Sequence, residues 1–325
     1  GRERDPDLIR QQTNRTPLHG SICVEQPQEM QNAGQTRRGR TDTMDRRDFL
    51  KTVAGGACLG TLADAAWLLR PVPRHASARL PAQGPRAAWA GEDDKLHEAS
   101  YYNRLKHKEI ECVLCPRKCV VGDRERGYCG VRENRDGVYY TLVYDRPCSL
   151  HTDPIEKKPL YHFLPTSRAF SLATAGCNMN CKYCQNWEIS QVRPEQVRSR
   201  RMTAADCAAE ARRSRARSIA YTYTEPVVFF EYMRDIASEA RKHEIRNVMI
   251  SAGYVEEKPL VDLLPLLDAV KIDLKSFSDD YYRKVCRGRL EPVLRSLKAI
   301  RKHGVWLEIV YLVLPTMNDD PKEIE

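Results

Sequence analysis

The sequence predicts an α/β protein: a partial (β/α) barrel preceded by a small cysteine-rich module. From Arg168 onward, apolar runs of strand length alternate with amphipathic helical segments, and repeated βα units of this kind build a parallel sheet or barrel. Ahead of them, residues 92–165 combine a cluster of four cysteines with turn-rich sequence. With 325 residues, the chain is long enough to bury a sizeable core.

Three segments precede the module. Residues 1–43 are polar and lack apolar periodicity, so we expect disorder or an untranslated leader, with Met44 as the true start. Residues 44–78 resemble a twin-arginine signal, with Arg46 and Arg47, an apolar stretch and a terminal Ala-Ser-Ala; an ordinary amphipathic helix is the alternative. Residues 79–91 are expected to be a linker rich in Pro, Ala and Arg. The signal predicts export to the periplasm.

The barrel is expected over residues 166–325. The predicted strands are Ala169–Ala175, Ser218–Thr222, Asn247–Ser251, Ala269–Leu274 and Val305–Leu314. The predicted helices are Thr203–Arg217, Val227–His243 and Pro292–His303, the first with Thr203 and Asp206 spaced as a capping box. The chain stops in what looks like the opening of another helix, so we expect a barrel truncated at its carboxyl end.

Charge and hydropathy exclude two classes of partner. The formal net charge is +9, and the first 91 residues, with 14 basic and 9 acidic side chains, supply more than half of it. The remaining chain therefore lacks the concentrated basic face that binding to nucleic acid needs. Beyond residue 70, no uncharged apolar stretch approaches the length of a membrane span, so no integral membrane segment is expected once the signal is removed.

The sharpest chemical signal is the run Cys177-Asn-Met-Asn-Cys181-Lys-Tyr-Cys184, directly after the first predicted strand. Loops at the carboxyl ends of barrel strands carry the active sites of such folds. Three closely spaced thiolates can hold an iron–sulfur cluster and leave one iron open to a further ligand. Structural zinc is the alternative, but it normally takes four ligands, and no fourth Cys or His follows until Cys207.

This spacing, with an aromatic residue before the last Cys, resembles the radical SAM superfamily. The resemblance implies a [4Fe–4S] cluster on Cys177, Cys181 and Cys184 whose open iron binds S-adenosylmethionine (SAM). One electron then cleaves SAM to a 5′-deoxyadenosyl radical, which abstracts hydrogen from a substrate. By the same resemblance, the SAM contacts are Tyr183, Glu225, Ser251, Asp273 and Lys275.

Within the superfamily, the segments around the cysteines resemble the radical SAM component of the AmmeMemoRadiSam system, which is similar to pyruvate formate-lyase activating enzymes. The segments that carry the resemblance are Asp153–Pro165, Gly176–Ser190, Tyr221–Tyr232 and Ile272–Lys275. It implies a reductant such as ferredoxin or flavodoxin and Memo-like and AMMECR1-like partner proteins. The substrate does not follow from the motifs, a protein being one alternative. Such low-potential chemistry favours the cytoplasm as the alternative location.

The earlier cysteines, Cys112, Cys115, Cys119 and Cys129, form a second possible metal site. Four thiolates imply a closed site, which could hold structural zinc, an auxiliary iron–sulfur cluster, or no metal at all. Cys207 and Cys286 fall in helical patterns and are expected to be small core residues. A non-enzymatic electron carrier or zinc-binding module is the alternative function, and such a protein would be expected to close both sites with four ligands.

Overall fold

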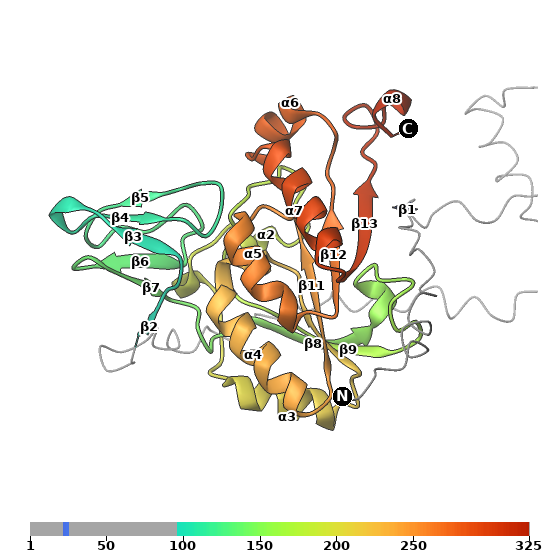
Figure 1. Cartoon of the computed structure of the whole chain (residues 1–325), viewed down its shortest axis with the longest axis horizontal. Helices are drawn as coiled ribbons and strands as arrows, with labels where there is room; N and C mark the ends of the chain where they lie inside the picture. Colours follow the sequence, from blue (N-terminus) through green and yellow to red (C-terminus); the bar gives the residue numbers. More distant parts are fainter. Residues whose placement is uncertain (1–21, 26–95, 325) are drawn as a thin grey trace, which may run out of the picture. The chain divides into compact units, whose positions relative to one another are not determined.

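The computed structural model describes residues 22–25 and 96–324, which belong to one compact unit (Figure 1). The predicted signal over 44–78 and the linker over 79–91 lie outside the described residues. Of the segment 1–43, only the strand β1 (Ile22–Glu25) is described. Among the described residues, no helix combines the length and the apolar character needed to cross a membrane.

A seven-stranded sheet forms the centre of the described part, in the order β1-β13-β12-β11-β10-β9-β8. Its pairs are parallel except that β8 runs antiparallel to β9. The successive strands β9 to β13 are spatial neighbours and run parallel, so their carboxyl ends lie at one edge of the sheet. The strands are β8 (Ser149–Pro154), β9 (Arg168–Ala173), β10 (Ser218–Tyr221), β11 (Arg246–Ser251), β12 (Ala269–Asp273) and β13 (Trp306–Leu312).

Helices connect these strands, and several of them cover one face of the sheet in Figure 1. The longer helices are α3 (Ala204–Arg213), α4 (Phe230–Lys242), α5 (Glu257–Leu263) and α7 (Leu290–Lys302). The short α-helices are α2 (Trp187–Ser190), α6 (Asp279–Tyr281) and α8 (Pro321–Ile324). Single turns complete the set: η3 (Lys106–Lys108), η4 (Ile155–Lys157), η5 (Pro194–Gln196), η6 (Pro226–Phe229), η7 (Leu264–Leu266) and the π-helical η8 (Tyr282–Cys286).

The predicted parallel α/β organisation is confirmed, and each of the five predicted strands lies within two residues of its expected bounds. The capping box at the start of α3 is present: the Asp206 amide donates to Thr203 Oγ1 at 3.2 Å, and the Thr203 amide donates to Asp206 Oδ2 at 2.9 Å. The helix ends earlier than predicted because Arg215 adopts a left-handed conformation with φ of 55°.

The core lies on both faces of the sheet. The larger cluster joins the helices to one face, through buried side chains such as Tyr221, Met249 and Ile272. On the other face, a smaller cluster packs Ile155 and Leu160 against strand residues. The predicted Asp153–Pro165 motif therefore covers this second face, where the Glu308 carboxylate accepts the backbone amides of residues 161–163.

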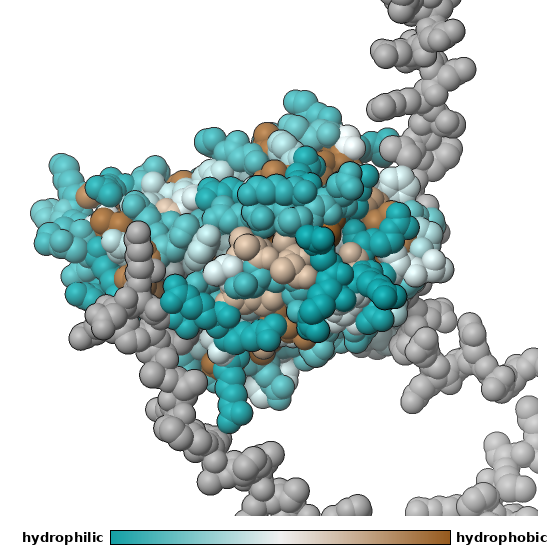
Figure 2. All heavy atoms as spheres, turned by 90° about the horizontal axis from the view of Figure 1, so that it is seen from below, coloured by the Kyte–Doolittle hydropathy of each residue, from teal (hydrophilic) through white to brown (hydrophobic). Residues whose placement is uncertain are grey.

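Residues 96–141 form two small antiparallel sheets beside the main one (Figure 1). One joins β2 (His97–Glu98), β7 (Val138–Thr141) and β6 (Arg132–Arg135); the other joins β3 (Tyr102–Arg104), β4 (Ile110–Cys112) and β5 (Val120–Val121). Arg132 on β6 forms a buried ion pair with Glu231 on α4 at 2.6 Å, which ties these sheets to the helical layer. The face shown in Figure 2 is mostly hydrophilic, with small hydrophobic patches.

Candidate active site

The loop that follows β9 carries the three cysteines of the Cys177–Cys184 motif. The Met179 amide donates to Cys177 Sγ at 3.3 Å, and Cys184 Sγ lies 3.2 Å from Ser190 Oγ. Burial raises the pKa of the Cys177 thiol, so without a metal this sulfur favours its neutral form. The ten cysteines in residues 96–324 are free thiols, so none of these ten forms a disulfide with another.

Gly176 lets this loop turn tightly against the small sheets. Its φ is +92°, a conformation that glycine adopts without strain. A Cβ atom at this position would lie 2.5 Å from Val131 Cγ1 and 2.7 Å from the Cys129 carbonyl oxygen. The backbone of the Cys177 loop therefore lies in contact with the segment that carries Cys129.

Cys286 lies at the same site, although its sequence context predicted only a core residue. It is buried, and its thiol is hydrogen-bonded with Cys181, which lowers the pKa of Cys286. Cys286 Sγ also lies 3.7 Å from the Tyr183 hydroxyl. The backbone holds η8 there, because the Asn180 and Lys182 amides donate to carbonyls of this turn. No motif surrounds Cys286, so nothing in the sequence indicated this position.

Glu225 and Ser251, predicted from separate turns, are in direct contact. Ser251 Oγ donates to Glu225 Oε1 at 2.6 Å, and the Ala252 amide donates to Glu225 Oε2 at 2.9 Å. Burial raises the pKa of Glu225, although these hydrogen bonds work in the opposite direction. A buried carboxylate held by neighbouring donors is suited to receive a cation at the carboxyl edge of the sheet.

Asp273 and Lys275 also lie together, 4.0 Å apart between Oδ2 and Nζ. Asp273 additionally pairs with the buried Lys271, so its carboxylate contacts two lysine ammonium groups. Burial alone would lower the pKa of Lys275, but the Asp273 carboxylate and the Cys181 thiol outweigh it and raise the pKa. Lys275 Nζ lies 5.8 Å from the centre of the Tyr183 ring, within range of a cation–π contact.

The donor set of the Cys177 loop suits an iron–sulfur cluster. Cysteine thiolates are the usual protein ligands of such clusters, and amide donors to their sulfurs, as at Cys177, tune them. In the part of the chain that the structure describes, no three His, Cys, Asp or Glu side chains form a group able to hold a single metal ion. If a cluster is bound, Cys177, Cys181 and Cys184 are the thiols that would hold it, with Tyr183, Glu225, Asp273 and Lys275 near them.

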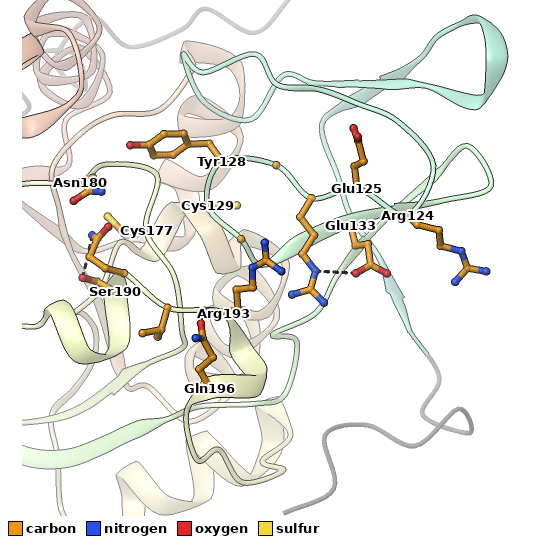
Figure 3. Close-up of a pocket in the computed structure, with 15 residues that line it drawn as sticks. Arg124, Glu125, Tyr128, Cys129, Glu133, Cys177, Asn180, Ser190, Arg193 and Gln196 are labelled. Atoms are coloured by element: carbon orange, nitrogen blue, oxygen red, sulfur yellow. Dashed lines mark hydrogen bonds and ion pairs between the residues drawn. The ribbon is translucent and has the colours of Figure 1, made fainter. Parts of the chain in front are cut away.

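The four earlier cysteines line one cavity, which Arg117, Arg132 and Tyr139 also line. A second, polar cavity of about 800 Å³ lies next to it, and both Cys129 and Cys177 line it (Figure 3). The two cysteine sets therefore lie close together in the structure, since Cys129 of one set and Cys177 of the other line the same cavity. The sequence did not predict this, because the two sets are far apart along the chain.

Comparison with known proteins identifies the family. The model of the radical SAM superfamily matches residues 171–324. An uncharacterized protein of Methanocaldococcus jannaschii is 46% identical over 225 residues, which cover 69% of this chain and 67% of that protein. The chain belongs to the radical SAM superfamily. It is also similar to a pyruvate formate-lyase-activating enzyme of Clostridium pasteurianum, at 23% identity over 46% of this chain and 63% of the relative.

Solved structures related to this radical SAM protein are more distant. A domain of a pyruvate-formate lyase-activating enzyme from Bacteroides vulgatus has a TM-score of 0.31 at 18% identity, over 33% of this chain and 66% of that one. A structure of TYW1 with a lysine-pyruvate adduct has a TM-score of 0.38 at 19% identity, over 50% of this chain and 61% of that one. The family assignment therefore rests on the sequence matches, and the chain is an enzyme of the radical SAM type.

Proposed function

We propose that Cys177, Cys181 and Cys184 bind a [4Fe–4S] cluster at which the protein reductively cleaves SAM and abstracts hydrogen from an unidentified substrate. When bound, the cluster supplies the electron for this cleavage and an open iron for SAM. The observation that carries the proposal is the position of the three thiols. They lie in the loop after β9, with buried polar groups from the loops after β10, β11 and β12 on the same edge of the sheet.

The protein's own residues would bind and orient SAM. The Glu225 carboxylate, already oriented by Ser251 and the Ala252 amide, is suited to accept hydrogen bonds from the SAM ammonium. Lys275 carries the positive charge suited to the SAM carboxylate, and Asp273 holds it in place. We assign Tyr183 to the adenine, since its ring lies beside Cys181 and Lys275.

An electron carrier is the less favoured function. Burying charged groups is costly unless each has a partner, and a carrier needs none of them. Glu225 is 3% exposed, and within residues 96–324 no cation lies at ion-pair distance from it, while Lys275 is largely buried beside a single carboxylate. Such a set is better explained by a ligand that carries both an ammonium and a carboxylate group, as SAM does.

We further propose that the protein is the radical SAM component of an AmmeMemoRadiSam system, with a partial barrel as its catalytic domain. Two segments support this proposal. Asp153–Pro165 covers one face of the sheet, and Gln185–Ser190 follows the cysteine loop and includes α2. Memo-like and AMMECR1-like proteins and a ferredoxin or flavodoxin reductant are the partners it implies. The twin-arginine-like segment supports export to the periplasm, with the cytoplasm as the alternative.

Product analysis tests the proposal. The full chain is reconstituted anaerobically with iron and sulfide, reduced with dithionite and incubated with SAM. We expect 5′-deoxyadenosine and methionine from wild type and from Cys207→Ala, a control that removes a buried thiol of α3, which lies 3.2 Å from the Tyr232 hydroxyl. Cys181→Ala should abolish both products. If wild type containing a cluster yields no 5′-deoxyadenosine, the proposed reaction is wrong.

We also propose that Cys112, Cys115, Cys119 and Cys129 bind a second metal centre, either an iron–sulfur cluster or zinc. Their common cavity supports this.

A further inference from the structure

The four thiols of the second site surround one cavity, and backbone donors accompany each of them. The Tyr128 amide donates to Cys119 Sγ at 3.4 Å. Burial raises the pKa of the Cys112, Cys115 and Cys129 thiols, and the backbone amides of Leu114, Arg117 and Val131, each two residues downstream, act in the opposite direction. Cys177 receives the same kind of hydrogen bond from Met179. Each cysteine set therefore contains a sulfur that accepts a backbone hydrogen bond of the kind that stabilises a metal-bound thiolate.

The hydroxyl of Tyr139 distinguishes between the two possible metals. Tyr139 is completely buried, lines the cavity, and its hydroxyl has no hydrogen-bond partner. Gly127 leaves room for it, since a Cβ there would lie 2.5 Å from the Tyr139 oxygen. A buried donor without a partner destabilises the folded state. An acceptor within the cavity would remove this cost.

None of the four cysteine sulfurs is the acceptor, because the Tyr139 hydroxyl reaches no partner in the structure. A zinc ion bound by four thiolates adds no acceptor beyond those sulfurs. An iron–sulfur cluster adds inorganic sulfides, which accept hydrogen bonds. Asn178 also lines this cavity, and its Oδ1 likewise lacks a hydrogen-bond partner. The alternative occupant is therefore a water molecule that bridges the Tyr139 hydroxyl and Asn178 Oδ1 in a cavity without metal.

Charge favours an anionic occupant. Arg132 and Arg117 both line the cavity, whereas no carboxylate from the described part of the chain does. Arg132 is 1% exposed and is paired with Glu231, and Arg117 is held by donation to the Asn178 carbonyl at 2.9 Å. Because the Glu231 carboxylate already balances Arg132, the Arg117 guanidinium is the group that can offset part of the negative charge of a thiolate-bound cluster.

We propose that Cys112, Cys115, Cys119 and Cys129 hold an iron–sulfur cluster and that the Tyr139 hydroxyl donates a hydrogen bond to one of its sulfides. The inference rests on the proposal that these cysteines bind metal but does not require SAM cleavage. The cluster lies beside the SAM site, because Cys129 and Cys177 line the same 800 Å³ cavity from two different loops (Figure 3).

The first experiment isolates this site. The variant Cys177→Ala/Cys181→Ala/Cys184→Ala removes the other cysteine set, and the full chain is reconstituted anaerobically. We expect it to retain iron and acid-labile sulfide in about equal amounts. Adding Cys129→Ala should abolish most of both, whereas adding Cys207→Ala should leave both unchanged. Zinc without sulfide, or no metal, in the triple variant would overturn the proposal whether or not wild type cleaves SAM.

The second experiment tests the hydrogen bond without removing a ligand. In the triple variant, Tyr139→Phe keeps the ring and removes only the hydroxyl. Losing a hydrogen bond to a sulfide should shift the reduction potential to a lower value at unchanged iron content. Tyr140→Phe, on the neighbouring position of β7, is the matched control and should not shift it. Equal potentials for Tyr139→Phe and the control would refute the role of Tyr139.

Discussion

Removing one partner of the buried Arg132–Glu231 ion pair should strongly destabilise the protein. Arg132 Nη2 lies 2.6 Å from Glu231 Oε2, and both side chains are 1% exposed. Glu231 also accepts the Ser100 amide at 2.6 Å, so Glu231→Ala leaves a buried guanidinium without its counter-charge and an amide without its acceptor. Breaking such a pair costs about 3–5 kcal/mol, which is roughly a 10²- to 10⁴-fold change in the unfolding equilibrium.

Urea denaturation followed by far-UV circular dichroism measures this loss, with every protein prepared in the same metal state. Glu239→Ala removes a partner of the solvent-exposed Lys242 and is the control, with an expected loss of at most about 1 kcal/mol. The double variant Arg132→Met/Glu231→Leu should recover much of the stability, because it leaves no unpaired charge. A loss below about 1 kcal/mol for Glu231→Ala, or a double variant no more stable than the single one, would refute this reasoning.

Three further predictions follow from other contacts. Gly176→Ala should lower the free energy of unfolding by more than about 1 kcal/mol and reduce the iron content, because φ is +92° and the added Cβ meets the Cys129 carbonyl. Urea denaturation and iron analysis measure these two effects, and a variant that matches wild type in both would contradict the prediction. Burial raises the pKa of Glu225, so this residue stabilises the fold below its ordinary pKa of 4.5, and the stabilisation is lost as pH rises. Above about pH 4.5, the urea midpoint of the metal-free wild type should therefore fall relative to that of Glu225→Gln. Midpoints that vary with pH in parallel for the two proteins would argue against this. Burial opposes it, but hydrogen bonding from Lys158 lowers the pKa of Asp153. Asp153→Asn should therefore have a lower free energy of unfolding than wild type at neutral pH, and the difference should shrink as pH falls below 3.8. A difference independent of pH would count against the ion pair.

The parts of the fold that sequence could predict are those with a local signal. The strands from β9 to β13 are short apolar runs between turns, and the start of α3 carries its own capping box, so both were predictable. The strand β8 was not, because it lies at the edge of the sheet, the exposure of its side chains does not alternate along it, and it ends in Pro154.

The residues of the candidate site also differ in whether a local sequence pattern marks them. The Cys177–Cys184 spacing is a local pattern, and Glu225 and Lys275 follow strands whose ends meet. Cys286 and Tyr139 are different, because each reaches its cysteine partners only through tertiary packing: one from a π-helical turn and one from a neighbouring small sheet. Neither position has a sequence pattern that distinguishes it from an ordinary core residue.

The contact between the Cys129 and Cys177 segments has a structural consequence for both proposed centres. Because Gly176 lies against the Cys129 carbonyl, a shift in one loop displaces the other. Loss of metal at either site should therefore perturb the spectrum of the remaining one. Comparing the two sets of cysteine variants in the same preparation would measure this.

Electron paramagnetic resonance of the reduced, reconstituted protein, recorded with and without SAM, tests the central claim most directly. A cluster held by Cys177, Cys181 and Cys184 with an open iron should give a signal that changes when SAM binds. Cys181→Ala should lose this response to SAM, while the second site still gives a signal, perturbed by the loss of the first cluster. A reduced wild-type spectrum that is identical with and without SAM would contradict the account.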